Sequence, residues 1–411
     1  MLSGSFTTLA LVGLAAAKVR FLGVSIPSGD SGCTIEGTCQ PNSTQLPSLP
    51  LGTTNNNNTS EAQMKHFATN DLMNIFRLPI PSQSLVADDS PSAPFLAQYD
   101  RLVQSCLATG AHCIIAPQGS PSEELWTALA KSYAASPSII FELPHPPPPA
   151  ATTLNTTTPD IDITTLDITT PDTATPDTDT TDTTAPDCPD TTNLDTPTLD
   201  TTPLDTAAAQ SAVSAIRAAG ATAQMILLPG LAFSSPEDVQ STGDGLAKIT
   251  NPDGGKENLL FALRRYLDEE NSGRQGTECA TNNNAAFETA AVYLRGVGRQ
   301  AVVTETGVPG GEDPFCFVWF CEQNRFVNGN ADVFAGLVVS AVGDGGLMPG
   351  WEGGRWVDAP VVANCVVGTW LASPVVDGGR GIGGVRGAAA GRVGVVWWVV
   401  GAGLGVAVVG L

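Results

Sequence analysis

Positive charge is scarce in this chain. Its 411 residues include 19 lysines and arginines against 41 aspartates and glutamates, for a net charge of −22. A surface this acidic repels phosphate groups, so we expect neither nucleic acid nor an anionic membrane surface as a partner. The length leaves room for one barrel-sized domain with appendages, and we expect a monomer.

Metal ligands and phosphate-binding loops are also few. The chain has three histidines, His66, His112 and His145, and no Cys-x-x-Cys pair. The usual Cys/His spacing of a zinc site is therefore missing, and we expect neither a metal nor another cofactor. No glycine-rich loop follows the first strand-like run, which disfavours a dinucleotide-binding open sheet.

The two ends of the chain resemble targeting signals. An apolar stretch that closes on Ala15-Ala16-Ala17 predicts a signal peptide over residues 1–17, although no lysine or arginine precedes it. Residues 376–411 form a small-residue spacer and an apolar tail, typical of a glycosylphosphatidylinositol (GPI) signal, with a short membrane span as the alternative. We therefore expect an extracellular protein of the cell surface or cell wall, joined to the membrane only through a C-terminal lipid anchor. Four N-glycosylation sequons fit a secreted glycoprotein: Asn42, Asn57, Asn58 and Asn155.

A Thr/Asp/Pro-rich repeat interrupts the middle of the chain at residues 146–206. It contains no lysine, arginine or glycine, and aspartate recurs every five residues through much of it. A period of five matches neither a helix nor a strand, so we predict a disordered insert that is open to O-glycosylation. A calcium-binding repeat is disfavoured because carboxylates that wrap around the ion need glycine-assisted turns.

The remaining segments, 18–145 and 207–375, alternate strand-like and helix-like patterns. Regular alternation over eight strands predicts a (β/α)8 TIM barrel in two halves, with a doubly wound open sheet as the alternative. The predicted strands are Val19–Gly23, Asn74–Leu78, His112–Ala116, Ser138–Phe141, Gln224–Leu228, Leu259–Leu263, Ala301–Thr304 and Val333–Val339. The clearest predicted helices are Pro94–Thr109, Ser122–Ala135, Ala207–Ala219 and Ala286–Val297.

One predicted strand ends in a candidate catalytic carboxylate. The apolar run Ala301–Val303 leads to Glu305, and Gly307 follows two residues later. In parallel barrels the catalytic side chains lie at the carboxyl ends of the strands, which favours a functional Glu305. A solvated glutamate at the edge of a loop is the alternative.

Longer motifs carry a family resemblance. They include Lys18–Val24, Ile75–Pro79, Thr250–Gly254, Tyr266–Asp268 and Thr304–Gly307. Together they resemble the fungal secreted endo-β-1,4-glucanases, or cellulases, of glycoside hydrolase family 5, subfamily 5, over roughly residues 18–365 without the repeat. The resemblance implies a TIM barrel, a retaining mechanism, and β-glucan or another cell-wall polysaccharide as the partner.

The resemblance also implies how the cysteines pair. Secretion favours oxidised cysteines. Cys188 lies inside the repeat and is left over from the nine. The implied disulfides are Cys33–Cys39, Cys106–Cys113, Cys279–Cys316 and Cys321–Cys365.

Retaining glycosidases need two carboxylates about 5 Å apart, one as nucleophile and one as acid/base. The resemblance implies that Glu305 is the nucleophile and that Arg77 is the family arginine that orients it. Tyr266 matches a tyrosine after the sixth strand, so Arg77 and Tyr266 are the expected substrate-binding residues.

The acid/base departs from the family pattern. The family ends its fourth strand with Asn-Glu-Pro-His, whereas residues 142–145 are Glu-Leu-Pro-His, so Leu143 takes the acid's place and Glu142 the asparagine's. Glu142 is a candidate acid/base if the strand is shortened, but a shift of one residue would turn its side chain to the opposite face. Three further departures are Ala116–Gly119 without the family's His-Asn pair, Arg264 in place of a histidine, and Val338–Ala341 without a tryptophan.

These departures leave two main hypotheses. We expect a divergent cellulase-like protein with a degraded active site and weak or no hydrolysis. If hydrolysis is absent, the protein would be a non-catalytic, glycan-binding surface protein of the cell wall. The alternative is an active retaining endoglucanase that uses Glu305 and Glu142. A reading-frame error in the unusual segments is a third explanation.

Overall fold

The computed structural model describes residues 18–26, 60–88, 90–144, 206–230, 234–268, 271, 279–308, 314–340 and 347–373. The predicted signal peptide, the four sequons, Cys33, Cys39 and the GPI-type tail lie outside the described residues. So does the repeat, apart from Thr206, with Cys188.

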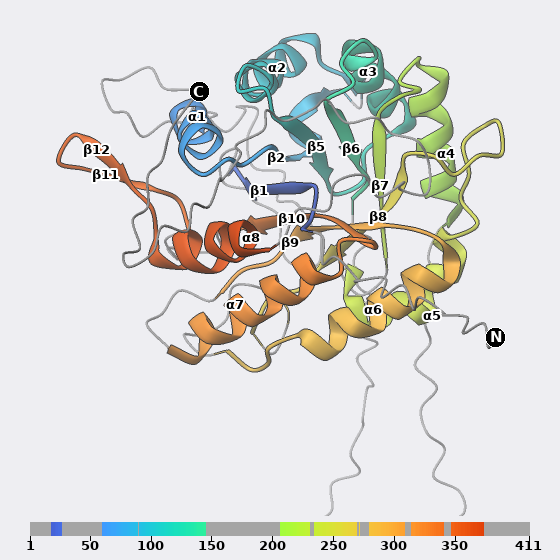
Figure 1. Cartoon of the computed structure of the whole chain (residues 1–411). Coiled ribbons are helices and arrows are strands. Elements are labelled where there is room, and N and C mark those ends of the chain that lie inside the picture. The colour runs from blue at the N-terminus through green and yellow to red at the C-terminus, as the bar shows by residue number, and fades with distance from the viewer. Residues whose placement is uncertain are drawn as a thin grey trace, which may run out of the picture.

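Eight parallel strands close into a barrel in the order β1-β10-β9-β8-β7-β6-β5-β2 (Figure 1). This confirms the predicted (β/α)8 TIM barrel, and each observed strand overlaps one of the eight predicted ones. Their near-continuous apolar sequences reflect burial on both faces, as expected of parallel strands. The bounds are β1 (Phe21–Ser25), β2 (Ile75–Pro81), β5 (His112–Gln118), β6 (Ile139–Glu142), β7 (Met225–Pro229), β8 (Leu259–Arg264), β9 (Ala301–Glu305) and β10 (Phe334–Ser340).

Alternation along the strands divides the core into two layers. One buried cluster fills the barrel interior and includes Ile75, Ile140, Ala262 and Val338. A larger cluster lies between the strands and the surrounding helices. Because side chains alternate along a strand, residues two positions beyond the interior set also point inward at the carboxyl ends. These residues are Arg77, Glu142, Arg264 and Ser340.

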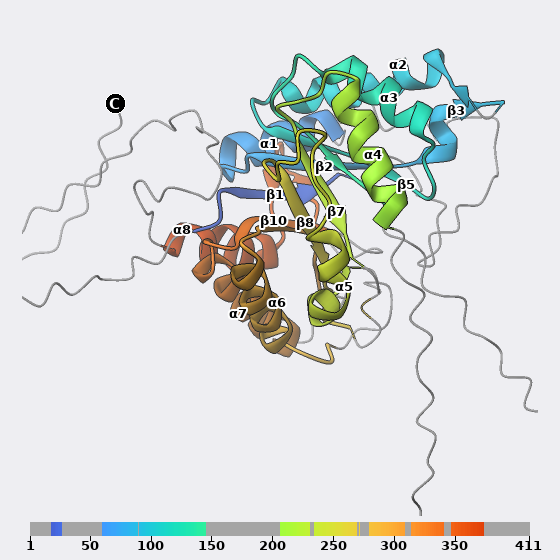
Figure 2. The ribbon, with the colours of Figure 1, turned by 90° about the vertical axis from the view of Figure 1, so that its right-hand side faces the viewer.

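Helices surround the barrel, with α2, α3 and α4 on one side and α5, α6 and α7 on the other (Figures 1 and 2). Helix α3 begins after Ser122, whose hydroxyl accepts a hydrogen bond from the Leu125 amide at 3.2 Å and so caps the first turn. The bounds are α1 (Ser60–Asn70), α2 (Ala93–Leu107), α3 (Glu123–Tyr133), α4 (Thr206–Ala218), α5 (Val239–Leu246), α6 (Asn284–Val297), α7 (Pro314–Gly329) and α8 (Thr369–Ala372).

Short elements decorate the connections. Strands β3 (Val86–Ala87) and β4 (Ser90–Pro91) form one small hairpin, and β11 (Gly350–Glu352) and β12 (Arg355–Val357) form another after β10. A π-helical segment, Val362–Gly368, runs into α8. Among the described residues, none of the helices combines the length and apolarity that a membrane crossing requires.

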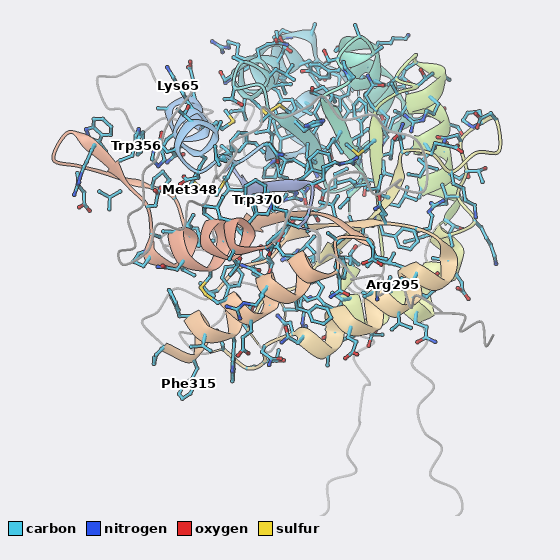
Figure 3. All side chains as sticks on the ribbon, viewed as in Figure 1. Lys65, Arg295, Phe315, Met348, Trp356 and Trp370 are labelled. Atoms are coloured by element: carbon cyan, nitrogen blue, oxygen red, sulfur yellow. A yellow bond between two sulfur atoms is a disulfide. The ribbon has the colours of Figure 1, made fainter. Side chains whose placement is uncertain are left out.

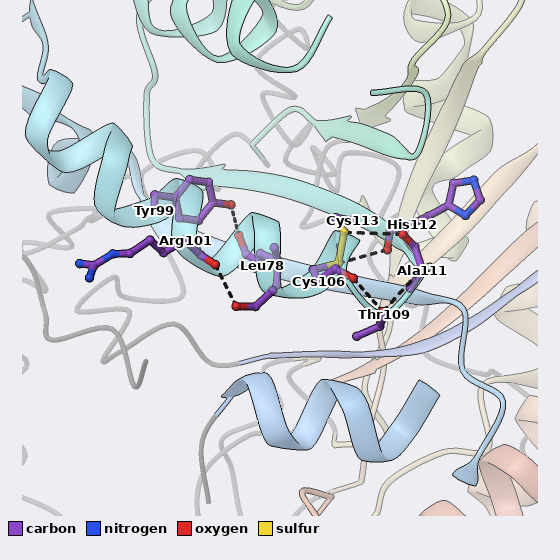
Figure 4. The surroundings of a disulfide bond; sticks show 9 residues. Leu78, Tyr99, Arg101, Cys106, Thr109, Ala111, His112 and Cys113 are labelled. Atoms are coloured by element: carbon purple, nitrogen blue, oxygen red, sulfur yellow. Dashed lines mark hydrogen bonds between the residues drawn. A yellow bond between two sulfur atoms is a disulfide. The ribbon is translucent and has the colours of Figure 1, made fainter. Parts of the chain in front are cut away.

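Three of the four implied disulfides are confirmed, and the fourth, Cys33–Cys39, lies outside the described residues. Cys106–Cys113 joins the end of α2 to the start of β5 (Figure 4). Cys321–Cys365 ties α7 to the π-helical segment, and Cys279–Cys316 ties the segment before α6 to α7. Near the first bridge, the Tyr99 hydroxyl donates to the Leu78 carbonyl at 2.6 Å, which fixes α2 against β2.

Candidate active site

A buried arginine joins two carboxylates at the carboxyl end of the barrel. Arg77 on β2 points into the barrel and is 2% exposed. Its Nε and Nη2 donate to the two carboxylate oxygens of Glu142 on β6 at 2.7 and 3.0 Å. The same Nη2 lies 2.8 Å from Oε1 of Glu305 on β9. One guanidinium therefore pairs with both candidate catalytic glutamates.

Glu305 has two further partners, both contributed by β8 and the residues that follow it. The Tyr266 hydroxyl donates to Oε2 of Glu305 at 3.1 Å. Nε of Arg264 lies 3.3 Å from the same oxygen. Arg264 occupies the place of the family histidine. Glu305 therefore has two positive charges beside it, those of Arg77 and Arg264.

Burial and charge shape the protonation of the groups around Glu305. Burial acts to lower the pKa of Arg77, but the charges of Glu142 and Glu305 outweigh it and raise that pKa. Burial, reinforced by the charge of Glu305, raises the pKa of the Tyr266 hydroxyl. Tyr266 is therefore a neutral hydrogen-bond donor at physiological pH, and Arg77 is a permanent cation.

The two carboxylates are close together. An oxygen of each lies about one hydrogen-bond length from Arg77 Nη2, so those oxygens are no farther apart than the sum of the two contacts, 3.0 and 2.8 Å. This resembles the separation of roughly 5 Å in retaining glycosidases more than the roughly 6.5–9.5 Å of inverting ones.

The predicted site residues are Glu305, Arg77, Tyr266 and Glu142, and the structure brings all four together. Glu142 faces the barrel interior, as its place in the strand alternation requires. Leu143, in the place of the family acid, faces the outer core, and its amide donates to the Leu227 carbonyl at 3.0 Å. The site residue on β6 is therefore the glutamate that replaces asparagine.

A buried amide network behind the site was not foreseen from the sequence. The Gln323 amide nitrogen donates to the Thr306 hydroxyl at 2.8 Å, and Asn283 donates to Gln323 at 2.8 Å and to the Tyr266 carbonyl at 3.0 Å. Asn271 accepts from the Tyr266 amide at 2.7 Å. These contacts fix the segments that carry Tyr266 and Glu305. They come from separate parts of the chain, so no local motif could reveal them.

Close backbone packing also positions Glu305. The Ser340 amide donates to the Thr306 carbonyl at 2.7 Å, which ties the segment after β9 to the end of β10. A Cβ atom on Gly307 would lie 2.5 Å from the Ser340 carbonyl oxygen, so only glycine fits there. The glycine that follows the candidate nucleophile therefore has a packing role.

Comparisons with known proteins identify the lineage. Residues 195–329 match the cellulase family, glycosyl hydrolase family 5. Endoglucanase EG-II of Hypocrea jecorina is 33% identical over 85% of this chain and 78% of its own length. The chain belongs to glycoside hydrolase family 5. Endoglucanase 1 of Saitozyma flava is also similar, 32% identical over 68% of this chain and 72% of its own length.

The solved structures agree with this assignment to family 5. The crystal structure of Cel5A (EG2) from Hypocrea jecorina matches with a TM-score of 0.64 at 32% identity, and the match covers 85% of this chain and 98% of that one. The resemblance to family 5 cellulases that the motifs indicated is therefore confirmed, and with it a lineage of polysaccharide degradation.

The ion pair at Arg77 yields a stability prediction. Replacing Arg77 by methionine leaves two buried carboxylates without their shared cation, so the free energy of unfolding should fall by about 3–5 kcal/mol. Chemical denaturation measures this loss. Arg295→Met is the control, because it breaks an ion pair with Asp332 whose side chains are 43% and 57% exposed. That variant should lose less than about 1 kcal/mol. Equal losses in the two variants would contradict the pairing described here.

Proposed function

We propose that this family 5 barrel is a β-1,4-glucan-binding protein whose hydrolytic activity is weak or absent. The observation that carries the proposal is the state of Glu142, the only carboxylate that β6 contributes to the site. It is 1% exposed and receives two hydrogen bonds from Arg77. Its carboxylate is thus committed to the guanidinium.

A general acid must carry a proton and reach the glycosidic oxygen. A bidentate guanidinium partner stabilises the charged form of a carboxylate, which has no proton to give. Burial also keeps the Glu142 oxygens inside the barrel, beneath the surface on which a polysaccharide would lie. Both conditions for acid catalysis are therefore unfavourable at this residue.

The nucleophile is restrained as well. A carboxylate attacks a sugar carbon with an oxygen that must be available. Oε1 of Glu305 contacts Arg77, and Oε2 contacts both Tyr266 and Arg264. Arg77 and Tyr266 match residues of the family pattern, so Arg264 is the contact that departs from it. The guanidinium of Arg264 adds a positive charge that a neutral histidine would not supply, so it weakens Glu305 as a nucleophile.

The substrate class follows from the relatives, which carry the name endoglucanase. The β11–β12 hairpin offers a surface for such a ligand because it follows β10, on the side of the barrel where active sites lie. Trp351 on this hairpin is 41% exposed and packs against Trp356 with ring centroids 5.2 Å apart. Exposed aromatic rings of this kind present an apolar face to a ligand.

The second candidate is an active retaining endoglucanase with Glu305 as nucleophile and Glu142 as acid/base. The observation in its favour is the short separation of the two carboxylates across Arg77 Nη2. It requires Glu142 to leave the guanidinium when substrate binds.

Hydrolysis of a soluble β-1,4-glucan separates the two candidates. General acid catalysis contributes roughly 10² to 10⁴ in rate, so the full chain should be at least about a hundredfold slower than Hypocrea jecorina endoglucanase EG-II. Calorimetric titration with a cello-oligosaccharide should still detect binding, and its absence would contradict the glucan-binding assignment.

Two variants identify the carboxylates on which any measured activity depends. Strong hydrolysis abolished by both Glu305→Gln and Glu142→Gln would establish the active endoglucanase and overturn the proposal. Strong hydrolysis that is lost in Glu305→Gln but unchanged in Glu142→Gln would also overturn the proposal. It would mean that another carboxylate supplies the proton.

We propose further that the protein is secreted and held at the cell surface by a GPI anchor. The supporting features are the signal-like start and the apolar C-terminal tail of the sequence. Expressed in a fungal host, the protein should be released from membranes by phosphatidylinositol-specific phospholipase C. Retention on the membrane, with the peptide 395–411 still present, would instead indicate a membrane span.

A further inference from the structure

Three metal-ligating side chains meet beside helix α1. His66 lies on α1, Asp71 directly follows the helix, and Asp358 follows β12. His66 Nε2 is 2.7 Å from Asp358 Oδ1 and 3.7 Å from Asp71 Oδ2. One ligand atom from each residue lies within 4.8 Å of the others. The cluster shares no residue with the site around Arg77.

One of these atoms is buried and makes no hydrogen bond. Asp71 is 8% exposed, and its Oδ2 points toward His66 without a hydrogen-bond partner. Buried carboxylate oxygens in folded proteins nearly always have a donor or a cation, because leaving one without a partner is costly. The Asp71 oxygen, 3.7 Å from His66 Nε2, is therefore placed to accept a cation between the two side chains.

The charges of the cluster point to a cation. Two carboxylates face one imidazole, so histidine alone cannot balance them even when it is protonated. This crowding of negative charge is what a bound divalent cation relieves.

We propose that His66, Asp71 and Asp358 bind a divalent transition-metal cation, Zn²⁺ or Mn²⁺. One imidazole nitrogen and two carboxylate oxygens suit these ions, whereas Ca²⁺ and Mg²⁺ prefer oxygen ligands throughout. Bonds of about 2.0–2.2 Å to a central ion place neighbouring ligands about 3–4 Å apart, close to the observed spacing. The ion takes the lone pair of His66 Nε2, so the ring proton resides on Nδ1 and the hydrogen bond to Asp358 is replaced by shared coordination.

The ion would connect distant parts of the chain. His66 and Asp358 are 292 positions apart, and Asp358 directly follows the β11–β12 hairpin. The His66 ring packs against Trp356 of that hairpin, with ring centroids 5.5 Å apart. Figure 3 shows Trp356 on the hairpin beside α1, where Lys65 is labelled. Coordination would thus fix the hairpin that presents Trp351.

Thermal unfolding of the full chain tests the site. After treatment with a chelator, added Zn²⁺ or Mn²⁺ should raise Tm by roughly 5 °C at about a hundred times the dissociation constant. Equal concentrations of Mg²⁺ and Ca²⁺ should have little effect. Asp358→Asn and His66→Gln should each abolish the rise.

Asp332→Asn is the matched control, because it removes an exposed carboxylate from a different part of the surface and should keep the full rise. The Asp-rich repeat is present in every variant, so any cation bound there would shift all of them equally. A rise that persists in both ligand variants, or no rise with either metal, would overturn the proposal.

A second measurement does not depend on stability. Elemental analysis after gel filtration should find about one Zn²⁺ or Mn²⁺ more per chain in the wild type and in Asp332→Asn than in the ligand variants. The same metal content in all four proteins would contradict the site. This comparison holds even if His66→Gln lowers Tm by itself, because Asp358→Asn changes a less buried side chain.

Discussion

A single guanidinium, buried at the carboxyl end of the barrel and shared by two glutamates, is the interaction on which the site depends. Arg77 from β2 reaches Glu142 on β6 and Glu305 on β9 across the barrel interior. The buried charges of Arg77, Glu142 and Glu305 stabilise one another, so removing one leaves an uncompensated buried charge and lowers the stability of the fold. The positions of both carboxylates are therefore coupled to each other through the arginine.

This coupling has a chemical consequence. In the function proposed here, the two hydrogen bonds from Arg77 occupy both carboxylate oxygens of Glu142, one of which an acid would need. Arg264 adds another cation, 3.3 Å from the Glu305 oxygen that Tyr266 also contacts. The barrel of a polysaccharide-degrading family is thus preserved, and the weak hydrolysis that we propose would follow from the ion-pair network at its carboxyl end. Fold and lineage alone do not decide activity, since function resides in the site.

Much of the fold could be predicted from the sequence. Parallel strands buried on both faces leave continuous apolar runs such as Ala301–Val303, and these marked all eight strands to within a few residues. The site was partly predictable, because Glu305, Arg77 and Tyr266 stand in recognisable motifs. The displaced Glu142 was visible as a replacement of asparagine, but its bond to Arg77 was not, because register across β2, β5 and β6 decides which side chains meet.

The contacts of other residues could not be predicted from the sequence. Arg264 stood out only as a missing histidine, and its pairing with Glu305 depends on the shift in register between β8 and β9. His66, Asp71 and Asp358 form no motif, because Asp358 is brought to α1 by the path of the chain after the last barrel strand. Contacts of this kind arise from tertiary packing, which local sequence patterns do not predict.

The central claim is that Arg77 keeps Glu142 from acting as an acid. Its most direct test compares cellobiosides whose leaving groups differ in acidity. A dinitrophenolate departs without a proton, whereas a sugar needs one. The account predicts that kcat/KM rises steeply with leaving-group acidity, so that dinitrophenyl cellobioside is cleaved far faster than a cello-oligosaccharide. Nearly equal values for the two substrates would show that a working acid is in place and would contradict the account.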